Sequence, residues 1–518
     1  MTTYTLRKGS PAKTRTDLVV IGVARTAKGG LEVCPGAEDV AAAYGRRFRP
    51  LLASMGFDGN VGEVLRVPTA GSLKAVQLLV VGLGKRESLT LEGVRRAAGV
   101  AARNTGNAAS VALALPAHDA DHVRAVVEGF ISGGYTFTGY KSRSDDSGVA
   151  EVSILSDVAR RQDATAALEA GHTVGDLVNR ARDWVNTPPN DLTPELFADA
   201  VVKLGKDLTG RARRPKVDIE VLDPGDLEKL GCGGILGVGA GSANGPRLVR
   251  LTWAPEDARS SVAFVGKGVT YDSGGLTIKP GSSMATMKYD MGGAAAVLAA
   301  TFAIAELGLP VGVTTYAPMA ENMLSGDAMR PGDVLTMYDG QTVEVTNTDA
   351  EGRLILADAL AMATEGDHDA ILDVATLTGP CIIALGDKVA GVFGDDETTA
   401  AVKAAAEVSG EMLWRLPIPP ETHEAVRTES KIADLLQHNW VRWGSALFAA
   451  AFLSAFVGGK PWAHLDIAGP AYNGGGPWGH VPSGATGYAI TTLVAYAANL
   501  AESGAESGAE AAADQNEA

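Results

Sequence analysis

Four acidic residues lie in segments that otherwise have the composition of a protein core. Asp272, Asp290, Asp349 and Glu351 all fall within residues 265–353, a stretch rich in glycine and in apolar side chains. Burying a carboxylate is costly unless it is paired or coordinates a metal ion. Glycine lets the backbone turn tightly and approach a site closely. The stretch therefore predicts cations bound among the four carboxylates.

The type of ligand indicates which cations these are. Carboxylates are hard oxygen donors that suit Mg, Mn or Zn. Without metal, four converging carboxylates would repel and would raise one another's pKa values. Two divalent ions, about 3.5–4 Å apart as in bimetallic hydrolases, remove that conflict. Asp349 and Glu351 are two residues apart, so an extended segment would point both side chains to one face.

Two other kinds of site fit the same stretch less well. A Walker phosphate loop needs Ser or Thr after Lys267, where Gly268 stands, and a glycine where Ser261 stands. A dinucleotide fingerprint needs a glycine in place of Tyr271. Serine catalysis at Ser273 is disfavoured because the segment is not G-x-S-x-G and no histidine is close in sequence.

Histidine and cysteine chemistry is not indicated elsewhere. His464 is the best histidine for a catalytic triad, but we interpret it as a core or interface residue. The three cysteines are widely spaced and form no CxxC pair, so neither a thiolate zinc site nor a disulfide framework is implied. They are interpreted as packing residues, and a reducing, cytoplasmic location is expected.

Composition narrows the class of protein further. The chain has 518 residues, 46% hydrophobic and 20% charged, and a formal net charge of -16. This length predicts at least two domains. The acidic balance without a basic run argues against nucleic-acid binding and against a polybasic membrane anchor. No apolar run reaches the roughly 18 residues of a membrane span, and residues 1–16 lack the apolar core of a secretory signal.

Strand-like and helix-like patterns alternate through both halves of the chain. This alternation predicts an α/β fold with two domains, each a mainly parallel or mixed sheet flanked by helices. A helical pattern over residues 160–185 is expected to join them. We place an N-terminal α/β domain at 1–165 and a C-terminal domain that carries the acidic cluster at 166–500. Residues 501–518 are acidic and lack large apolar side chains, so a disordered tail is expected.

One motif makes the chain recognisable. The sequence Asn-Thr-Asp-Ala-Glu-Gly-Arg-Leu at residues 347–354 matches the signature of the leucyl aminopeptidase (cytosol aminopeptidase) family of metallopeptidases. The block from Gly266 to Gly293 also fits that family at the expected spacing. The resemblance covers residues 170–500, whereas the N-terminal region resembles the family only in size and in strand–helix order.

The resemblance implies a role for each matching residue. Five residues would bind two divalent metals, Mn or Zn: Lys267, Asp272, Asp290, Asp349 and Glu351. Lys279 would stabilise the oxyanion, and Arg353 would hold a bicarbonate that acts as general base. The side-chain pocket for the substrate would be lined by Met287, Met291, Thr376, Leu377, Gly379 and Ala468.

The function implied is a two-metal aminopeptidase. It would release N-terminal residues from peptides, preferably leucine or other apolar residues, by metal-activated water. The family also implies a homohexamer. The alternative is a DNA-binding or regulatory protein of the same fold without a peptidase role. The intact set of site residues and the acidic balance argue against that alternative.

Overall fold

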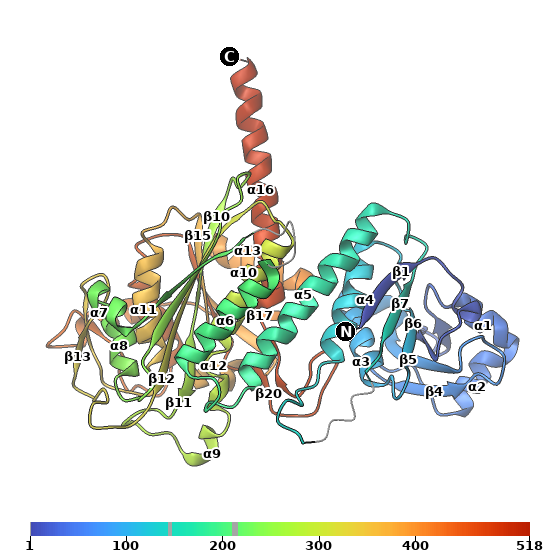
Figure 1. Cartoon of the computed structure of the whole chain (residues 1–518), viewed down its shortest axis with the longest axis horizontal. Helices are drawn as coiled ribbons and strands as arrows, with labels where there is room; N and C mark the ends of the chain where they lie inside the picture. Colours follow the sequence, from blue (N-terminus) through green and yellow to red (C-terminus); the bar gives the residue numbers. More distant parts are fainter. Residues whose placement is uncertain (1, 143–147, 210–215, 518) are drawn as a thin grey trace. The chain divides into compact units, whose positions relative to one another are not determined.

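The computed structural model describes residues 2–142, 148–209 and 216–517. Its residues form two compact units (Figure 1): residues 1–179 with 474–483, and residues 180–473 with 484–518. Helix α5 (Gln162–Asn186) begins in the first unit and ends in the second. The predicted long helix between two sheet-containing units is confirmed. The structure also returns a short segment, 474–483, from the catalytic half to the first unit.

The first unit contains a mixed seven-stranded sheet in the order β1-β7-β6-β2-β5-β4, with β3 paired to β2. The pairs β1–β7, β7–β6, β6–β2 and β2–β5 are parallel, while β3 and β4 join antiparallel. The strands are β1 (Thr3–Arg7), β2 (Leu18–Arg25), β3 (Leu31–Val33), β4 (Val64–Pro68), β5 (Gln77–Lys85), β6 (Ser110–Ala114) and β7 (Glu151–Leu155). The main helices are α1 (Glu38–Tyr44), α2 (Phe48–Ser54), α3 (Leu91–Arg103) and α4 (Ala120–Gly133).

The central strand β2 explains why its sequence is a continuous apolar run. Leu18 and Val20 belong to the core cluster that includes residues of α3 and α4. The alternate residues Val19 and Ile21 belong to a second cluster with residues of α1 and α2. Successive side chains of a strand point to opposite faces, so a strand covered on both faces must be apolar at every position.

The second unit is built on a nine-stranded sheet in the order β17-β16-β19-β15-β10-β12-β9-β8, with β11 paired to β12. The central pairs β19–β15, β15–β10, β10–β12 and β12–β11 are parallel, and β8, β9 and β16 pair antiparallel with their neighbours towards the centre. The strands are β8 (Asp218–Leu222), β9 (Arg247–Trp253), β10 (Ser261–Gly266), β11 (Gly268–Asp272), β12 (Gly312–Asn322), β15 (Ala370–Ala375), β16 (Val389–Gly394), β17 (Met412–Arg415) and β19 (Trp462–Asp466).

Two apolar helices contact the central strands. Both α10 (Gly292–Glu306) and α11 (Gly352–Ala363) are buried along almost their whole length. Strand β15, which follows α11 in the sequence, is buried at every position, as its apolar run predicts. The other helices are α6 (Pro194–Thr209), α7 (Pro224–Leu230), α8 (Gly233–Gly239), α9 (Gly281–Met284), α12 (Gly379–Leu385), α13 (Asp396–Ser409), α14 (Pro420–Thr428), α15 (Ser445–Ser454) and α16 (Ile490–Glu517). Small sheets are formed by β13 (Val334–Thr336), β14 (Thr342–Glu344) and β18 (Leu435–Leu436), and by β20 (Tyr472–Asn473) and β21 (Gly484–Ala485).

The C-terminal segment differs from its prediction. Helix α16 continues through Glu517, whereas the sequence predicted disorder from Ala501. The absence of large apolar residues removes packing, but alanine and glutamate are strong helix formers and extend a helix that has already begun. Among the described residues, no helix is both long enough and apolar enough to cross a membrane.

Candidate active site

Several predicted site residues of the second unit stand at the ends of parallel strands. Lys267 follows β10, Asp272 is the last residue of β11, and Thr376 follows β15. Because these strands run parallel, their carboxyl ends lie at one edge of the sheet. Ligands of open α/β sheets bind at that edge. The loops that follow the strands therefore bring residues distant in sequence into one site.

A cavity of about 290 Å³ opens at this edge. Every predicted site residue except Met291 lines it: Lys267, Asp272, Lys279, Met287, Asp290, Asp349, Glu351, Arg353, Thr376, Leu377, Gly379 and Ala468. Met291 is fully buried at the start of α10 and does not reach the cavity, so its placement in the pocket was wrong.

Lys267 is held inside a ring of oxygen atoms. Its Nζ lies 2.7 Å from both carboxylate oxygens of Asp290 and 2.8 Å from Oε1 of Glu351. It also donates to the carbonyl of Thr376 at 3.1 Å. Burial lowers the pKa of Lys267, but the three carboxylates around it, Asp290 first, hold that pKa above its ordinary value. Only a neutral amine can bind a metal, so Lys267 would serve as a ligand only after a divalent ion displaces its proton.

Lys279 neutralises the other side of the cluster. Its Nζ lies 2.7 Å from Asp272 and 2.5 Å from Asp349. Its side chain is 16% exposed, and the surrounding carboxylates keep its pKa above the ordinary value although burial opposes this. An ammonium ion therefore sits at the cavity wall with Asp272 and Asp349 as its partners.

The carboxylates have the donor set of a metal centre. Oxygen atoms of Asp272, Asp290 and Glu351 lie within 4.8 Å of one another, and all three side chains are buried. Burial raises the pKa of Asp272 to about 7 and also raises that of Asp290. The Oε2 atom of Glu351 is buried with no hydrogen-bond partner among the described residues. An unpartnered carboxylate oxygen in a buried acidic cluster fits a divalent cation as its partner.

The segment that carries Asp349 and Glu351 is not extended as predicted. Asp349 lies in a turn in which its backbone N–H donates to the side chain of Asn347, and Glu351 has helical φ and ψ at the start of α11. Both side chains nevertheless line the cavity. The positive end of a helix favours a carboxylate at this position.

Gly352 is required by a close approach. A Cβ atom at this position would lie 2.3 Å from Cε of Lys267 and 2.7 Å from its Nζ. Any side chain would therefore displace the lysine from Asp290 and Glu351.

Arg353 carries a buried positive charge at the cavity. Its side chain is 4% exposed, Nη1 donates to the carbonyl of Gln437 at 2.8 Å, and Nε has no partner among the described residues. Burial lowers its pKa to about 10. The guanidinium is buried, and no ion pair with it is found in the described part of the chain. An unpartnered N–H on a buried cation is suited to a small anion.

Asp466 is a structural organiser of the cavity that sequence reasoning missed. This buried carboxylate accepts from the backbone N–H groups of Leu377, Thr378 and Ala468 at 3.1–3.4 Å, and from the Thr378 hydroxyl at 2.6 Å. It thereby ties the loop after β15 to the loop after β19. The sequence feature that could have identified Asp466 is its position as the last residue of an apolar strand, where a carboxylate needs buried partners.

His464 and Ser273 do not form a triad. Nδ1 of His464 lies 2.6 Å from Asp373, and its ring stacks on Phe393. The Ser273 hydroxyl donates to the carbonyl of Asn322 at 2.7 Å. Both side chains are buried with these partners, as expected of packed core residues.

Comparison with known families decides the relationship. Residues 179–494 match the family model described as the cytosol aminopeptidase family, catalytic domain. The chain belongs to the cytosol aminopeptidase family. Residues 20–144 match the N-terminal domain of the same family, which extends the resemblance beyond the size and strand–helix order seen in the sequence.

Individual relatives agree with this assignment. The chain is 47% identical over 516 residues to a probable cytosol aminopeptidase of Streptomyces coelicolor, covering 95% of this chain and 98% of that protein. It is 42% identical over 497 residues to one of Rhodococcus jostii, covering 95% and 96%. Among solved structures, the bottromycin maturation enzyme BotP in complex with Mn is 38% identical, with a TM-score of 0.81 over 94% of this chain and 100% of that one. Membership of the cytosol aminopeptidase family makes this chain a metal-dependent peptidase acting on peptides.

Proposed function

We propose that the protein is a two-metal aminopeptidase that releases N-terminal residues from peptides, preferably leucine and other apolar residues. The observation that carries the proposal is that charged and apolar side chains line one cavity. Carboxylates and cations line it, and Met287, Leu377, Ile382 and Ala468 offer apolar surface in the same cavity. Soft apolar surface of this kind accepts a leucine or methionine side chain.

Five cavity residues have the donor atoms for two divalent ions, Mn or Zn. Asp272 and Glu351 would contact both ions, Lys267 and Asp290 one of them, and Asp349 the other. When bound, the ions would supply Lewis acidity at the peptide carbonyl and would lower the pKa of water. The carboxylate of Asp290 is also available to the free α-amine of the substrate, which explains removal from the N-terminus alone.

Two cations of the chain would complete the chemistry. The Lys279 ammonium lines the cavity and stays protonated, so it would donate to the oxygen that becomes negative during amide cleavage. The planar guanidinium of Arg353, with an unpartnered N–H, would hold a bicarbonate ion as a proton acceptor. We propose further that the protein acts in the cytoplasm as a homohexamer. No observation favours a DNA-binding or regulatory role without peptidase activity.

Removing the metal should abolish activity. Dialysis against a chelator is expected to reduce hydrolysis of leucine p-nitroanilide by at least about 10³-fold, and Mn or Zn should restore it, because several kcal/mol of stabilisation depend on the ions. Metal content measured in parallel should approach two ions per chain. In a panel of aminoacyl p-nitroanilides, leucine and methionine should exceed aspartate and lysine by about 10-fold or more in kcat/KM. Full activity of metal-free protein would refute the proposal.

Asp466→Asn should weaken substrate binding without removing metal. An amide cannot accept at both of its polar atoms, so at least one bond to the loop after β15 is lost. We expect KM for leucine p-nitroanilide to rise about 10-fold, corresponding to one lost hydrogen bond to a charged group, with kcat changed less. The exposed Asp367→Asn is the matched control. Loss of metal from Asp466→Asn, or an unchanged KM, would contradict this positioning role.

A further inference from the structure

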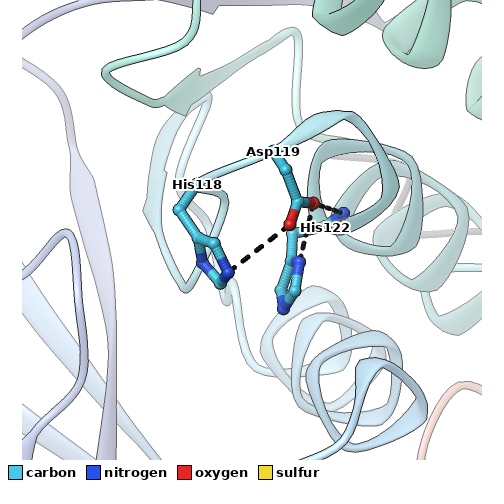
Figure 2. A group of neighbouring side chains, drawn as sticks. All are labelled: His118, Asp119 and His122. Atoms are coloured by element: carbon cyan, nitrogen blue, oxygen red, sulfur yellow. Dashed lines mark hydrogen bonds and ion pairs between the residues drawn. The ribbon is translucent and has the colours of Figure 1, made fainter.

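A second group of metal-ligating side chains lies in the first unit, at the start of α4. The sequence His-Asp-Ala-Asp-His at residues 118–122 brings His118, Asp119 and His122 together. Figure 2 shows the two imidazole rings on the same side of the helix start, with the Asp119 carboxylate beside both. The ring centroids are 3.9 Å apart. The family assignment and the proposed reaction leave this group without a role.

The two oxygens of Asp119 are used differently. Oδ1 caps the helix by accepting from the backbone N–H of His122 at 2.9 Å, and it lies 2.8 Å from Nδ1 of the same residue. Oδ2 faces Nε2 of His118 at 3.5 Å (Figure 2). The carboxylate can therefore keep its capping bond through one oxygen and offer the other to a ligand.

The spacing suits a small coordination sphere. One nitrogen of each imidazole and one carboxylate oxygen all lie within 4.8 Å of one another. In a tetrahedral site with metal–ligand distances of 2.0–2.1 Å, ligand atoms are separated by about 3.3 Å. The separation of 3.5 Å between Nε2 of His118 and Oδ2 of Asp119 is close to that value. The side chains of His118 and His122 are 59% and 21% exposed, so rotation of the two rings can adjust the remaining distances.

We propose that His118, Asp119 and His122 bind one divalent transition-metal ion of the class that imidazole selects, namely Zn, Ni or Cu. Two nitrogen donors and one oxygen donor leave a position for water, so the ion remains accessible. Mg and Ca, which need six or more oxygen ligands, do not fit this donor set.

The nearby charges do not block a cation. Arg161 interacts electrostatically with Asp119, but its guanidinium is paired with Asp163. The helix start carries a partial positive charge, which Asp119 Oδ1 already offsets as the cap. The site is exposed to solvent, so it would bind more weakly than a buried four-ligand zinc site.

The donor atoms distinguish this site from the active-site cavity. No histidine is among the residues that line that cavity, whose donors are carboxylates and lysine. Imidazole nitrogen bound to Cu²⁺ gives a characteristic modulation in pulsed electron paramagnetic resonance. Copper in the catalytic cavity would not give it, so the signal reports histidine coordination even in the full-length, catalytically competent protein.

The experiment adds Cu²⁺ stepwise to the whole protein and records this modulation. Wild type is expected to show coordination by two imidazoles, and Zn²⁺ in excess should displace it. His118→Ala with His122→Ala should remove it, and Asp119→Asn should weaken Cu²⁺ binding about 10-fold. Asp121→Asn changes an exposed acid two residues after Asp119. It is the control and should leave the modulation unchanged.

Two outcomes would overturn the proposal. One is absence of imidazole modulation in wild type even when Cu²⁺ is added in excess over the two ions proposed for the catalytic cavity. The other is unchanged modulation in the double variant, which would assign it to other histidines. His118→Ala alone, at the more exposed position, should halve the number of coordinated imidazoles if the double variant does not fold. Hydrolysis of leucine p-nitroanilide should be the same in all these variants, which separates this site from the proposed catalytic centre.

Discussion

Glu351→Gln should reduce kcat for leucine p-nitroanilide by at least about 10³-fold. The substitution preserves the shape of the side chain but removes the charge of the residue proposed to contact both metals. A 10³-fold loss corresponds to about 4 kcal/mol of transition-state stabilisation. One oxygen of Glu351 lies 2.8 Å from Nζ of Lys267, and the other is buried without a partner. Metal content should fall together with activity, as measured by elemental analysis of the dialysed protein.

The control for this variant is Glu397→Gln, which removes an exposed carboxylate elsewhere in the second unit. It should retain both metal and activity. Asp349→Ala, at the more exposed end of the cluster, should likewise abolish the metal-dependent reaction. Full metal content and undiminished turnover in Glu351→Gln would show that this carboxylate is structural and would remove the centre of the proposed site.

Lys279→Ala should lower kcat by about 10²–10³-fold, the range seen when one donor to a developing oxyanion is removed. The structure adds an expectation about metal. Lys279 neutralises Asp272 and Asp349, so its loss increases the negative charge that attracts divalent ions. Metal content should therefore be retained or increased while turnover falls. Steady-state kinetics with elemental analysis of the same preparation measure both.

Lys403→Ala removes an exposed lysine and serves as the control for Lys279→Ala. Loss of metal in proportion to activity would assign Lys279 to the metal site and not to the reacting carbonyl. A rise in KM with unchanged kcat would instead assign it to substrate binding.

Much of the candidate active site was predictable because burying a carboxylate is costly, which restricts where acidic residues occur in apolar sequence. Asp272, Asp290 and Glu351 stand in apolar, glycine-rich sequence, and the structure brings their oxygens together. The alternating patterns also predicted the sheets, since strands covered on both faces are apolar throughout, as in β15. The family signature then suggested roles that periodicity alone could not supply.

Other features depended on tertiary contacts. The depth of Met291 and the organising bonds of Asp466 follow from how loops pack, and local sequence does not encode either. The turn at Asp349 was missed because a two-residue spacing suits a strand, while the side chain of Asn347 stabilises a turn leading into α11. The tail was predicted to be disordered because it lacks large apolar residues, whereas the helix found there is favoured by its alanine and glutamate residues.

The contact between Gly352 and Lys267 limits how this active site can change. A Cβ atom at position 352 would lie only 2.3 Å from Cε of Lys267. The first turn of α11 therefore leaves no room for a side chain beside the lysine. Redesigning that turn to alter metal preference would displace Lys267, which lies between β10 and β11. Met287 and Ile382 also line the cavity, so new substrate specificities are best sought there, leaving the proposed metal ligands untouched.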